Sequence, residues 1–211
     1  MNGITLESVE NYMRDLLPPR DPVIAEMEDF AERHRVPIVG PMVGRFLYQL
    51  ARFVDAARVF EMGSAIGYST IWFARALKPG GKVYYTDGSQ DNAARAREYI
   101  KRTGVTDRVE ILVGNALELI DRVEGEFDIV FNDVDKCDYP TVYRKAADRV
   151  RIGGLLLSDN VLWSGRVADA AVTDEYTEGV RSFNKLLYAD KRYYSTILPL
   201  RDGVAVGLRV G

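Results

Sequence analysis

Residues 127–160 read FDIVFNDVDKCDYPTVYRKAADRVRIGGLLLSDN, and this stretch decides the fold. Apolar runs at residues 127–132 and 155–159 flank a helical pattern at residues 139–150, which ends at a breaker, RIGG, at residues 151–154. Continuous apolar runs are typical of strands that a parallel sheet buries on both faces. The stretch therefore predicts a strand–helix–strand unit with parallel strands.

Polar side chains follow both strands, Asp133 after the first and the pair Asp159 and Asn160 after the second. The carboxyl ends of parallel strands meet at the edge where open α/β sheets bind ligands. Oxygen ligands suit a hard cation, and three of them leave about three positions of an octahedral Mg²⁺ for substrate oxygens and water. His34 and Cys137 are the only residues of their types, which argues against zinc. We predict a divalent-metal site, with Mg²⁺ as the first choice and Ca²⁺ or Mn²⁺ as alternatives.

A glycine-bearing turn lies upstream, in VFEMGSAIGYST at residues 59–70. Glycines at 63 and 67 let a ligand approach the backbone amides, and the helix that follows favours an anionic group at its start. A P-loop would need Gly-Lys-Ser/Thr, but Gly67 is followed by Tyr68 and Ser69. Nucleoside triphosphate hydrolysis is therefore disfavoured.

A dinucleotide fingerprint is also incomplete, because Ala65 stands at the middle glycine of G-x-G-x-x-G. Asp87, at the tip of the next strand, suits the two hydroxyls of a ribose, although it could instead cap the following helix. Because the turn lacks a good site for a pyrophosphate, a ligand in which adenosine is joined to an amino acid is more plausible than a dinucleotide. This pattern favours S-adenosylmethionine.

The rest of the chain continues the alternation and predicts an α/β fold. Helices are expected at residues 9–17, 23–35, 43–53, 69–77, 91–103, 116–123 and 180–188, and further strands at 58–62, 82–87, 108–113, 193–200 and 203–210. A turn as short as residues 201–203 makes the last two strands antiparallel. We predict one domain over residues 1–211, with a helical cap at 1–55 and a Rossmann-like core at 56–211 that has helices on both faces.

Composition supports a single core, since 211 residues with 47% hydrophobic side chains contain no linker rich in Pro, Gly or Ser. A net charge of −3 without a run of Lys or Arg argues against a nucleic-acid or anionic-membrane surface. No stretch reaches the roughly 18 apolar residues of a membrane span, and the first residues do not look like a secretion signal. With a single cysteine excluding an internal disulfide, we expect a cytoplasmic protein.

Four segments together resemble the cation-dependent class I S-adenosylmethionine O-methyltransferases, which include the caffeoyl-CoA and catechol O-methyltransferases. They are EMGSAIGYST at 61–70, NDVDKCDY at 132–139, SDNVLWSGRV at 158–167 and LPLRDGVAVGL at 198–208, in register over about residues 36–210. The resemblance implies a seven-stranded methyltransferase sheet with a terminal antiparallel hairpin.

Carried over residue by residue, the resemblance implies a site. Asp133, Asp159 and Asn160 would ligate the metal, and Lys136 would lie beside the acceptor hydroxyl as general base. The cofactor would contact Val39, Glu61, Gly63, Ser64, Gly67, Tyr68, Ser69, Asp87, Gly88, Asn115, Ala116 and Asp133. Two positions depart from the family pattern: Asn115, where Asp or another polar group is common, and Asn132, where an apolar residue is usual.

Two further residues are candidates for contact with the substrate. Trp163 is a candidate wall of an aromatic acceptor pocket, with ordinary packing as the alternative. Asp135 could add a further carboxylate to the metal and substrate site; the alternative is that its side chain faces solvent. Lys136 can act as a base only if its pKa, ordinarily about 10.4, is lowered; otherwise it is an electrostatic orienter.

The predicted function is methyl transfer from S-adenosylmethionine to a hydroxyl of a catechol-like or hydroxycinnamoyl-like small molecule, with a divalent metal. The phenolate would attack the sulfonium methyl in line, without a covalent enzyme intermediate. Two alternatives stay open: methylation of a hydroxylated uridine in tRNA, and a non-catalytic cofactor-binding protein. The amphipathic N-terminal helices predict a homodimer.

Overall fold

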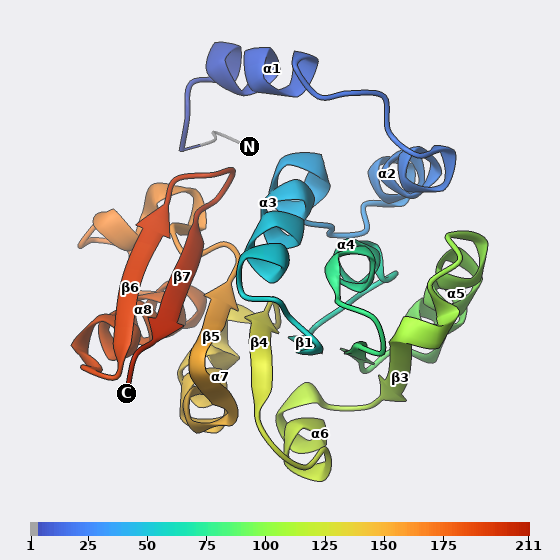
Figure 1. The fold of residues 1–211 in the computed structure, drawn as a ribbon. Helices are drawn as coiled ribbons and strands as arrows, with labels where there is room; N and C mark the ends of the chain where they lie inside the picture. The colour runs from blue at the N-terminus through green and yellow to red at the C-terminus, as the bar shows by residue number, and fades with distance from the viewer. Residues whose placement is uncertain (1–3) are drawn as a thin grey trace.

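A seven-stranded sheet forms the centre of the protein in the computed structural model, which describes residues 4–211 (Figure 1). The strand order is β3-β2-β1-β4-β5-β7-β6; β1 to β5 are parallel, and β7 is antiparallel to both β5 and β6. The strands are β1 Arg58–Met62, β2 Lys82–Asp87, β3 Val109–Val113, β4 Phe127–Asn132, β5 Val150–Ser158, β6 Tyr193–Leu198 and β7 Val204–Arg209. The predicted parallel sheet with a terminal hairpin is confirmed.

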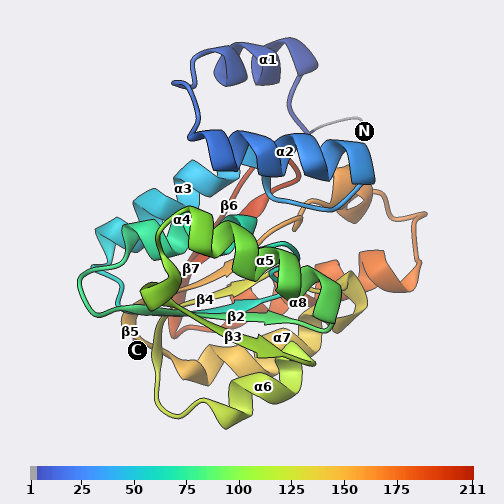
Figure 2. The same ribbon diagram turned by 90° about the vertical axis from the view of Figure 1, so that its right-hand side faces the viewer.

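Helices cover both faces of this sheet (Figure 2). The α-helices are α1 Glu7–Asp15, α2 Pro22–His34, α3 Gly40–Phe53, α4 Tyr68–Ala76, α5 Gln90–Arg102, α6 Ala116–Arg122, α7 Tyr139–Ala146 and α8 Glu175–Ala189. Short 3₁₀ helices are η1 Thr106–Arg108, η2 Lys136–Asp138, η3 Ala147–Arg149 and η4 Trp163–Ala168. One face packs against α2 to α5 and the other against α6 to α8.

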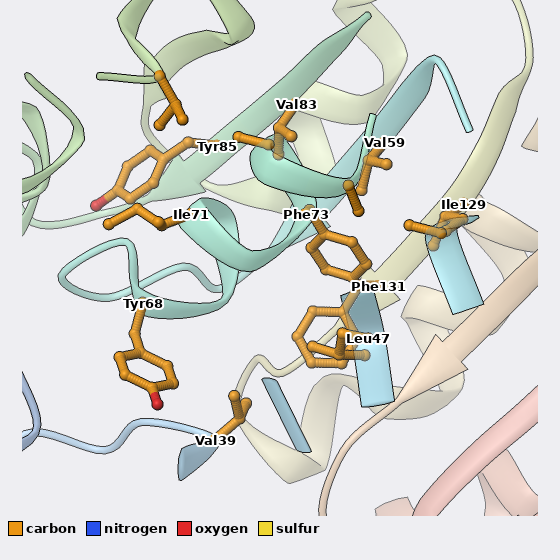
Figure 3. Close-up of a cluster of buried hydrophobic side chains, with 14 of the residues drawn as sticks. Val39, Leu47, Val59, Tyr68, Ile71, Phe73, Val83, Tyr85, Ile129 and Phe131 are labelled. Atoms are coloured by element: carbon orange, nitrogen blue, oxygen red, sulfur yellow. The ribbon is translucent and has the colours of Figure 1, made fainter. Parts of the chain in front are cut away.

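The central strands are buried on both sides, as their continuous apolar sequence predicts. In β4, Ile129 and Phe131 join the core beneath α3 and α4, whereas Val130 joins the core on the opposite face (Figure 3). In β5, Leu155 and Leu157 lie in the first core and Leu156 in the second. This alternation fixes the register that brings the ends of β4 and β5 together, with Asn132 opposite Ser158.

The predicted break at residues 151–154 is wrong, because these residues belong to β5. The pairing of β4 with β5 shifts register between Phe127 and Ile129, Gly153 has φ +77°, and a Cβ on Gly154 would lie 2.7 Å from the Asp128 carbonyl oxygen. The two glycines therefore allow an irregular, closely packed strand instead of ending it. The preceding helix, predicted to run to residue 150, ends as an α-helix at Ala146 and is followed by the 3₁₀ helix η3.

The N-terminal helices differ in how they pack. Ile24 and Met27 of α2 are in the core, whereas α1 has no buried residue among those described and is the outermost helix in both views (Figure 1 and Figure 2). Leu6, Tyr12 and Leu16 are 74, 65 and 65% exposed. The described residues include no helix long and apolar enough to cross a membrane. The division into a cap and a core stays a prediction.

Candidate active site at the carboxyl edge of the sheet

A cleft of about 1010 Å³ opens beside the carboxyl ends of β1, β2 and β4. Ten of the residues that the sequence nominates line it: Gly63, Asp87, Gly88, Asn115, Ala116, Asp133, Asp135, Lys136, Asn160 and Trp163. They come from five separate segments of the chain, at residues 63, 87–88, 115–116, 133–136 and 160–163. The fold thus brings ten of the seventeen nominated residues around one cavity of a size that suits small ligands.

The other seven nominated residues are not part of this lining within the described chain. They are Val39, Glu61, Ser64, Gly67, Tyr68, Ser69 and Asp159, and all are buried. Val39 and Tyr68 belong to the apolar core (Figure 3), and the Tyr68 hydroxyl donates to Glu28 Oε1 of α2 at 2.6 Å. Tyr68 therefore fastens α2 to α4 and does not present its side chain to the cleft.

The glycine turn is shaped by close backbone packing. Gly63 has φ +84°, and a Cβ there would lie 2.5 Å from the Asp133 carbonyl oxygen. Gly67 also has φ +84° and precedes the first residue of α4. Both positions therefore require glycine, and the first one brings the turn directly against the segment that carries Asp133.

Asp87 connects the glycine turn to the loop after β2. Its Oδ2 accepts from the Ala65 amide at 3.0 Å, and its Oδ1 accepts from the Ser89 amide at 2.7 Å and from Asn92 Nδ2 at 3.1 Å. Ser89, not Asp87, caps α5, which settles one alternative left open by the sequence. A carboxylate accepts about four hydrogen bonds, so one remains for a ligand hydroxyl in the cleft.

The two asparagines that depart from the family pattern have local structural roles. Asn115 caps α6 by accepting from the Leu117 amide at 2.9 Å, a role that Asp or Asn fills equally well. Asn132 donates to Ser158 Oγ at 2.8 Å, and both side chains are fully buried. This bond ties the ends of β4 and β5 together immediately before Asp133.

Glu61 of β1 is fully buried among three hydroxyl groups. Burial raises the pKa of Glu61 to about 7, although hydrogen bonds from Ser69, Thr70 and Ser64 favour the charged form. Its Oε1 has no hydrogen-bond partner in the described chain. Thr70 Oγ1 donates to Glu61 Oε2, and the two serines predicted to contact the cofactor lie near the same carboxyl group.

Asp133 and Asp159 are two neighbouring carboxyl groups: the side chain of Asp159 is fully buried, and that of Asp133 is 19% exposed. Burial and the negative charge of Asp133 raise the pKa of Asp159 to about 7. Burial also raises the pKa of Asp133, an effect that the positive charge of Lys136 reduces. Lys136 Nζ lies 3.0 Å from Asp133 Oδ1, and Arg201 Nη1 lies 3.4 Å from Asp159 Oδ2. The two carboxylates are therefore close enough to repel each other.

These residues fit a divalent cation. Asp159 Oδ1 is buried without a hydrogen-bond partner among the residues described, and a cation would satisfy it and relieve the repulsion from Asp133. Asn160 lines the cleft and has φ +55°. Within residues 4–211, no three His, Cys, Asp or Glu side chains gather as a metal site, and the candidate set of Asp133, Asp159 and Asn160 contains two carboxylates and one amide.

Lys136 is held as a cation in this environment. Burial alone would lower the pKa of its ammonium group, but Tyr139 and Asp133 together raise it above its ordinary value. The raised pKa of Lys136 favours its ammonium form, the form that the electrostatic alternative uses. A Cβ on Gly179 of α8 would lie 2.2 Å from the Lys136 carbonyl oxygen, so α8 fixes the position of η2.

The sequence did not predict several of the residues that line the cleft. Arg201 and Asp202 come from the turn between β6 and β7, Arg35 follows α2, and Tyr176 stacks on Trp163 with ring centroids 6.3 Å apart. The sequence of a tight turn, such as the one between β6 and β7, does not indicate which distant loop the turn will contact. The Trp163–Tyr176 stack forms an aromatic side of the cleft, consistent with the predicted acceptor wall.

Comparison with known sequences gives the same family. Residues 19–210 match the O-methyltransferase family. A catechol O-methyltransferase of Niastella koreensis is 36% identical over 99% of each chain. Caffeoyl-CoA O-methyltransferase 1 of Eucalyptus globulus is 31% identical, over 91% of this chain and 84% of its own.

Solved structures agree with this result. An O-methyltransferase of Bacillus cereus in complex with SAH superposes with a TM-score of 0.87 and 32% identity, over 96% of this chain and 97% of its own. An O-methyltransferase of Streptomyces achromogenes in complex with SAM superposes with a TM-score of 0.88 and 30% identity, over 98% of this chain and 100% of its own. The chain therefore belongs to the O-methyltransferase family that contains the catechol and caffeoyl-CoA O-methyltransferases.

Proposed function

We propose that this protein transfers the methyl group of S-adenosylmethionine to a hydroxyl group of a catechol-like or hydroxycinnamoyl-like molecule, with the help of a divalent cation, Mg²⁺ being the first choice. The observation that carries the proposal is the position of Asp133. Its backbone packs against Gly63 of the glycine turn, and its carboxylate lies beside Lys136 and the buried Asp159. Cofactor, metal and acceptor would thus meet at one residue.

The cofactor half of the cleft supports this proposal. Asp87 has one acceptor position left for a ribose hydroxyl, and Asn115 lies in the same cavity with its Oδ1 committed to the helix cap. Gly88 lines the cavity with open space where a Cβ would stand. These groups suit an adenosine, and the SAH and SAM complexes of the two related structures agree with that choice.

The metal half would use Asp133, Asp159 and Asn160 as ligands. When bound, a divalent cation would favour the ionised form of an acceptor phenol, whose ordinary pKa is about 10. Lys136, as an ammonium group, would orient the acceptor oxygen and stabilise its negative charge; general-base action by Lys136 is the alternative. Trp163 would wall the aromatic ring, and Asp135 would lie near the acceptor.

The remaining chemistry is a single displacement that depends on positioning. The cleft would hold the acceptor oxygen and the methyl carbon in line and exclude water between them. No nucleophilic side chain is needed for such a transfer.

We also propose a homodimer. The exposed Leu6, Tyr12 and Leu16 around α1 present an apolar surface that a second copy would cover. Sedimentation velocity tests this: a dimer is expected at micromolar concentration, whereas a monomer would contradict it. The cytoplasmic location stays a prediction.

A methyl-transfer assay tests the proposed function. Catechol, caffeic acid, caffeoyl-CoA and total tRNA would each be offered with labelled S-adenosylmethionine, with Mg²⁺ and with EDTA. We expect labelled product from the small diphenols only, lost with EDTA and restored by Mg²⁺. Labelled tRNA alone would establish the uridine alternative, and cofactor binding without transfer to any acceptor would establish the non-catalytic one.

A further inference from the structure

Two cationic side chains pair with the two carboxylates of the proposed metal site. Lys136 pairs with Asp133, and Arg201 pairs with Asp159 at 3.4 Å, the longer of the two contacts. The Asp159 side chain is fully buried, whereas that of Arg201 is 39% exposed and lines the cleft. Arg201 therefore reaches the carboxylate from the accessible side.

The backbone at Arg201 is fixed by its surroundings. The Leu162 amide donates to the Asp202 carbonyl oxygen at 2.9 Å, and the Val161 amide donates to that of Gly203 at 3.1 Å. A Cβ on Gly203 would lie 2.5 Å from Leu162 Cγ. The turn between β6 and β7 is thus held against the segment that follows Asn160, which fixes the point from which the Arg201 side chain extends.

We propose that Arg201 is a built-in counter-ion of the metal site, which occupies Asp159 in the metal-free protein and lowers the affinity of the site for a divalent cation. This inference rests on the proposed metal site. Arg201 acts through Asp159, so it is a positioning residue. The guanidinium holds the carboxylate in place until a metal displaces it.

The geometry supports displacement over permanent pairing. A buried, ionised carboxylate without a counter-ion is costly, so Asp159 needs a cation beside it whenever it is ionised. A contact of 3.4 Å to a partly exposed arginine is at the weak end of the hydrogen-bond range and is easily exchanged. A guanidinium left beside a bound divalent cation would repel it. Removal of the arginine should therefore tighten metal binding.

Arg35 offers a matched control. It lines the same cleft and has φ +56°, close to the +55° of Arg201, but it makes no ion pair with a described residue. Arg201→Gly and Arg35→Gly thus remove the same side chain from similar backbone conformations in one cavity. Arg201→Lys retains a cation at the critical position.

The test is calorimetric titration of the metal-free full chain with Mg²⁺ at about pH 8, where unperturbed carboxyl groups are ionised. We expect Arg201→Gly to bind Mg²⁺ at least about tenfold more tightly than the wild type. Arg35→Gly should stay within about twofold. Arg201→Lys should lie between Arg201→Gly and the wild type. Unchanged or weaker binding by Arg201→Gly would overturn the inference.

Thermal unfolding supplies a second readout that does not depend on turnover. Without metal, Arg201→Gly should have a lower melting temperature than the wild type. Mg²⁺ should raise the melting temperature of Arg201→Gly by more than it raises that of the wild type. Equal Mg²⁺-induced shifts in the two proteins would also overturn the inference. If the wild type binds no Mg²⁺, the proposed metal site itself fails; if it binds and Arg201→Gly behaves identically, only the role of Arg201 fails.

Discussion

Gly63 and Asp133 are packed so closely that a single added carbon on Gly63 would lie 2.5 Å from the Asp133 carbonyl oxygen. The two residues follow neighbouring parallel strands, and the Asp133 amide donates to the Met62 carbonyl oxygen at 2.8 Å. The glycine turn and the acidic segment are therefore one rigid unit. A cofactor bound at the turn would be held at a fixed position relative to the carboxylate.

Gly63→Ala should destabilise the protein by about 2–4 kcal/mol, because it adds both a steric clash and an unfavourable positive φ. Urea unfolding measures this loss. Gly88→Ala is the control, since Gly88 lines the same cleft without a positive φ and has open space at its Cβ position among the described residues. Its stability should change by no more than about 0.5 kcal/mol. Equal effects of the two substitutions would contradict the packing argument.

Glu61 predicts a pH dependence of stability. Its folded-state pKa of about 7 lies above the ordinary 4.5, so the folded protein favours the protonated form. Stability from this group is fully present below about pH 4.5, falls as the pH rises, and is lost above about pH 7. Glu61→Gln should remove this penalty of about 3 kcal/mol at high pH.

The measurement is denaturant unfolding of metal-free wild type and Glu61→Gln between about pH 5 and pH 8. The difference in unfolding free energy should grow toward high pH in favour of the variant. A difference that is constant with pH would show that Glu61 is ionised throughout this range.

Lys136 is predicted to act through its charge. Lys136→Arg keeps a cation that cannot lose its proton, whereas Lys136→Met removes the cation. If Lys136 orients the acceptor, Lys136→Arg should keep kcat within about tenfold of the wild type, and Lys136→Met should lose about 100-fold or more. Steady-state methyl transfer to catechol measures both. A general base would instead be indicated by an equal loss of kcat in the two variants, together with a wild-type activity that rises with pH through a single ionisation.

Gly179→Ala should reverse the usual effect of this substitution in a helix. Alanine is normally favoured over glycine by about 1 kcal/mol, but here its Cβ would lie 2.2 Å from the Lys136 carbonyl oxygen. We expect a loss of about 1–3 kcal/mol and a lower kcat, because η2 must shift. Ser182→Ala, on the same helix, should change stability by less than about 0.5 kcal/mol. A stabilised Gly179→Ala would show that the contact relaxes without cost.

The sequence predicts the strands well because each central strand is a short apolar run that is buried on both faces. Residues 58–62, 82–87 and 127–132 are strands with the predicted bounds. The failure at residues 151–154 has a tertiary cause: paired glycines permit either a break or a bulged strand, and the pairing with β4 decides between them. Local sequence does not contain that partner.

The candidate site shows the same limit. Strand ends place Asp133, Asp87 and Asn160 at the cleft, because parallel topology alone brings those ends to one edge. The direction of the Tyr68 side chain depends on its contact with Glu28 in α2, and the reach of Arg201 depends on a turn fastened to a distant loop. Such contacts between remote segments are not encoded in any local pattern.

The most direct test of the central claim is anomalous diffraction from crystals of the protein grown with Mn²⁺ and S-adenosylhomocysteine. We expect one strong anomalous peak within about 2.0–2.3 Å of oxygens from Asp133, Asp159 and Asn160, inside the cleft. A fully occupied cofactor site without a peak there, or a peak at other residues only, would contradict it.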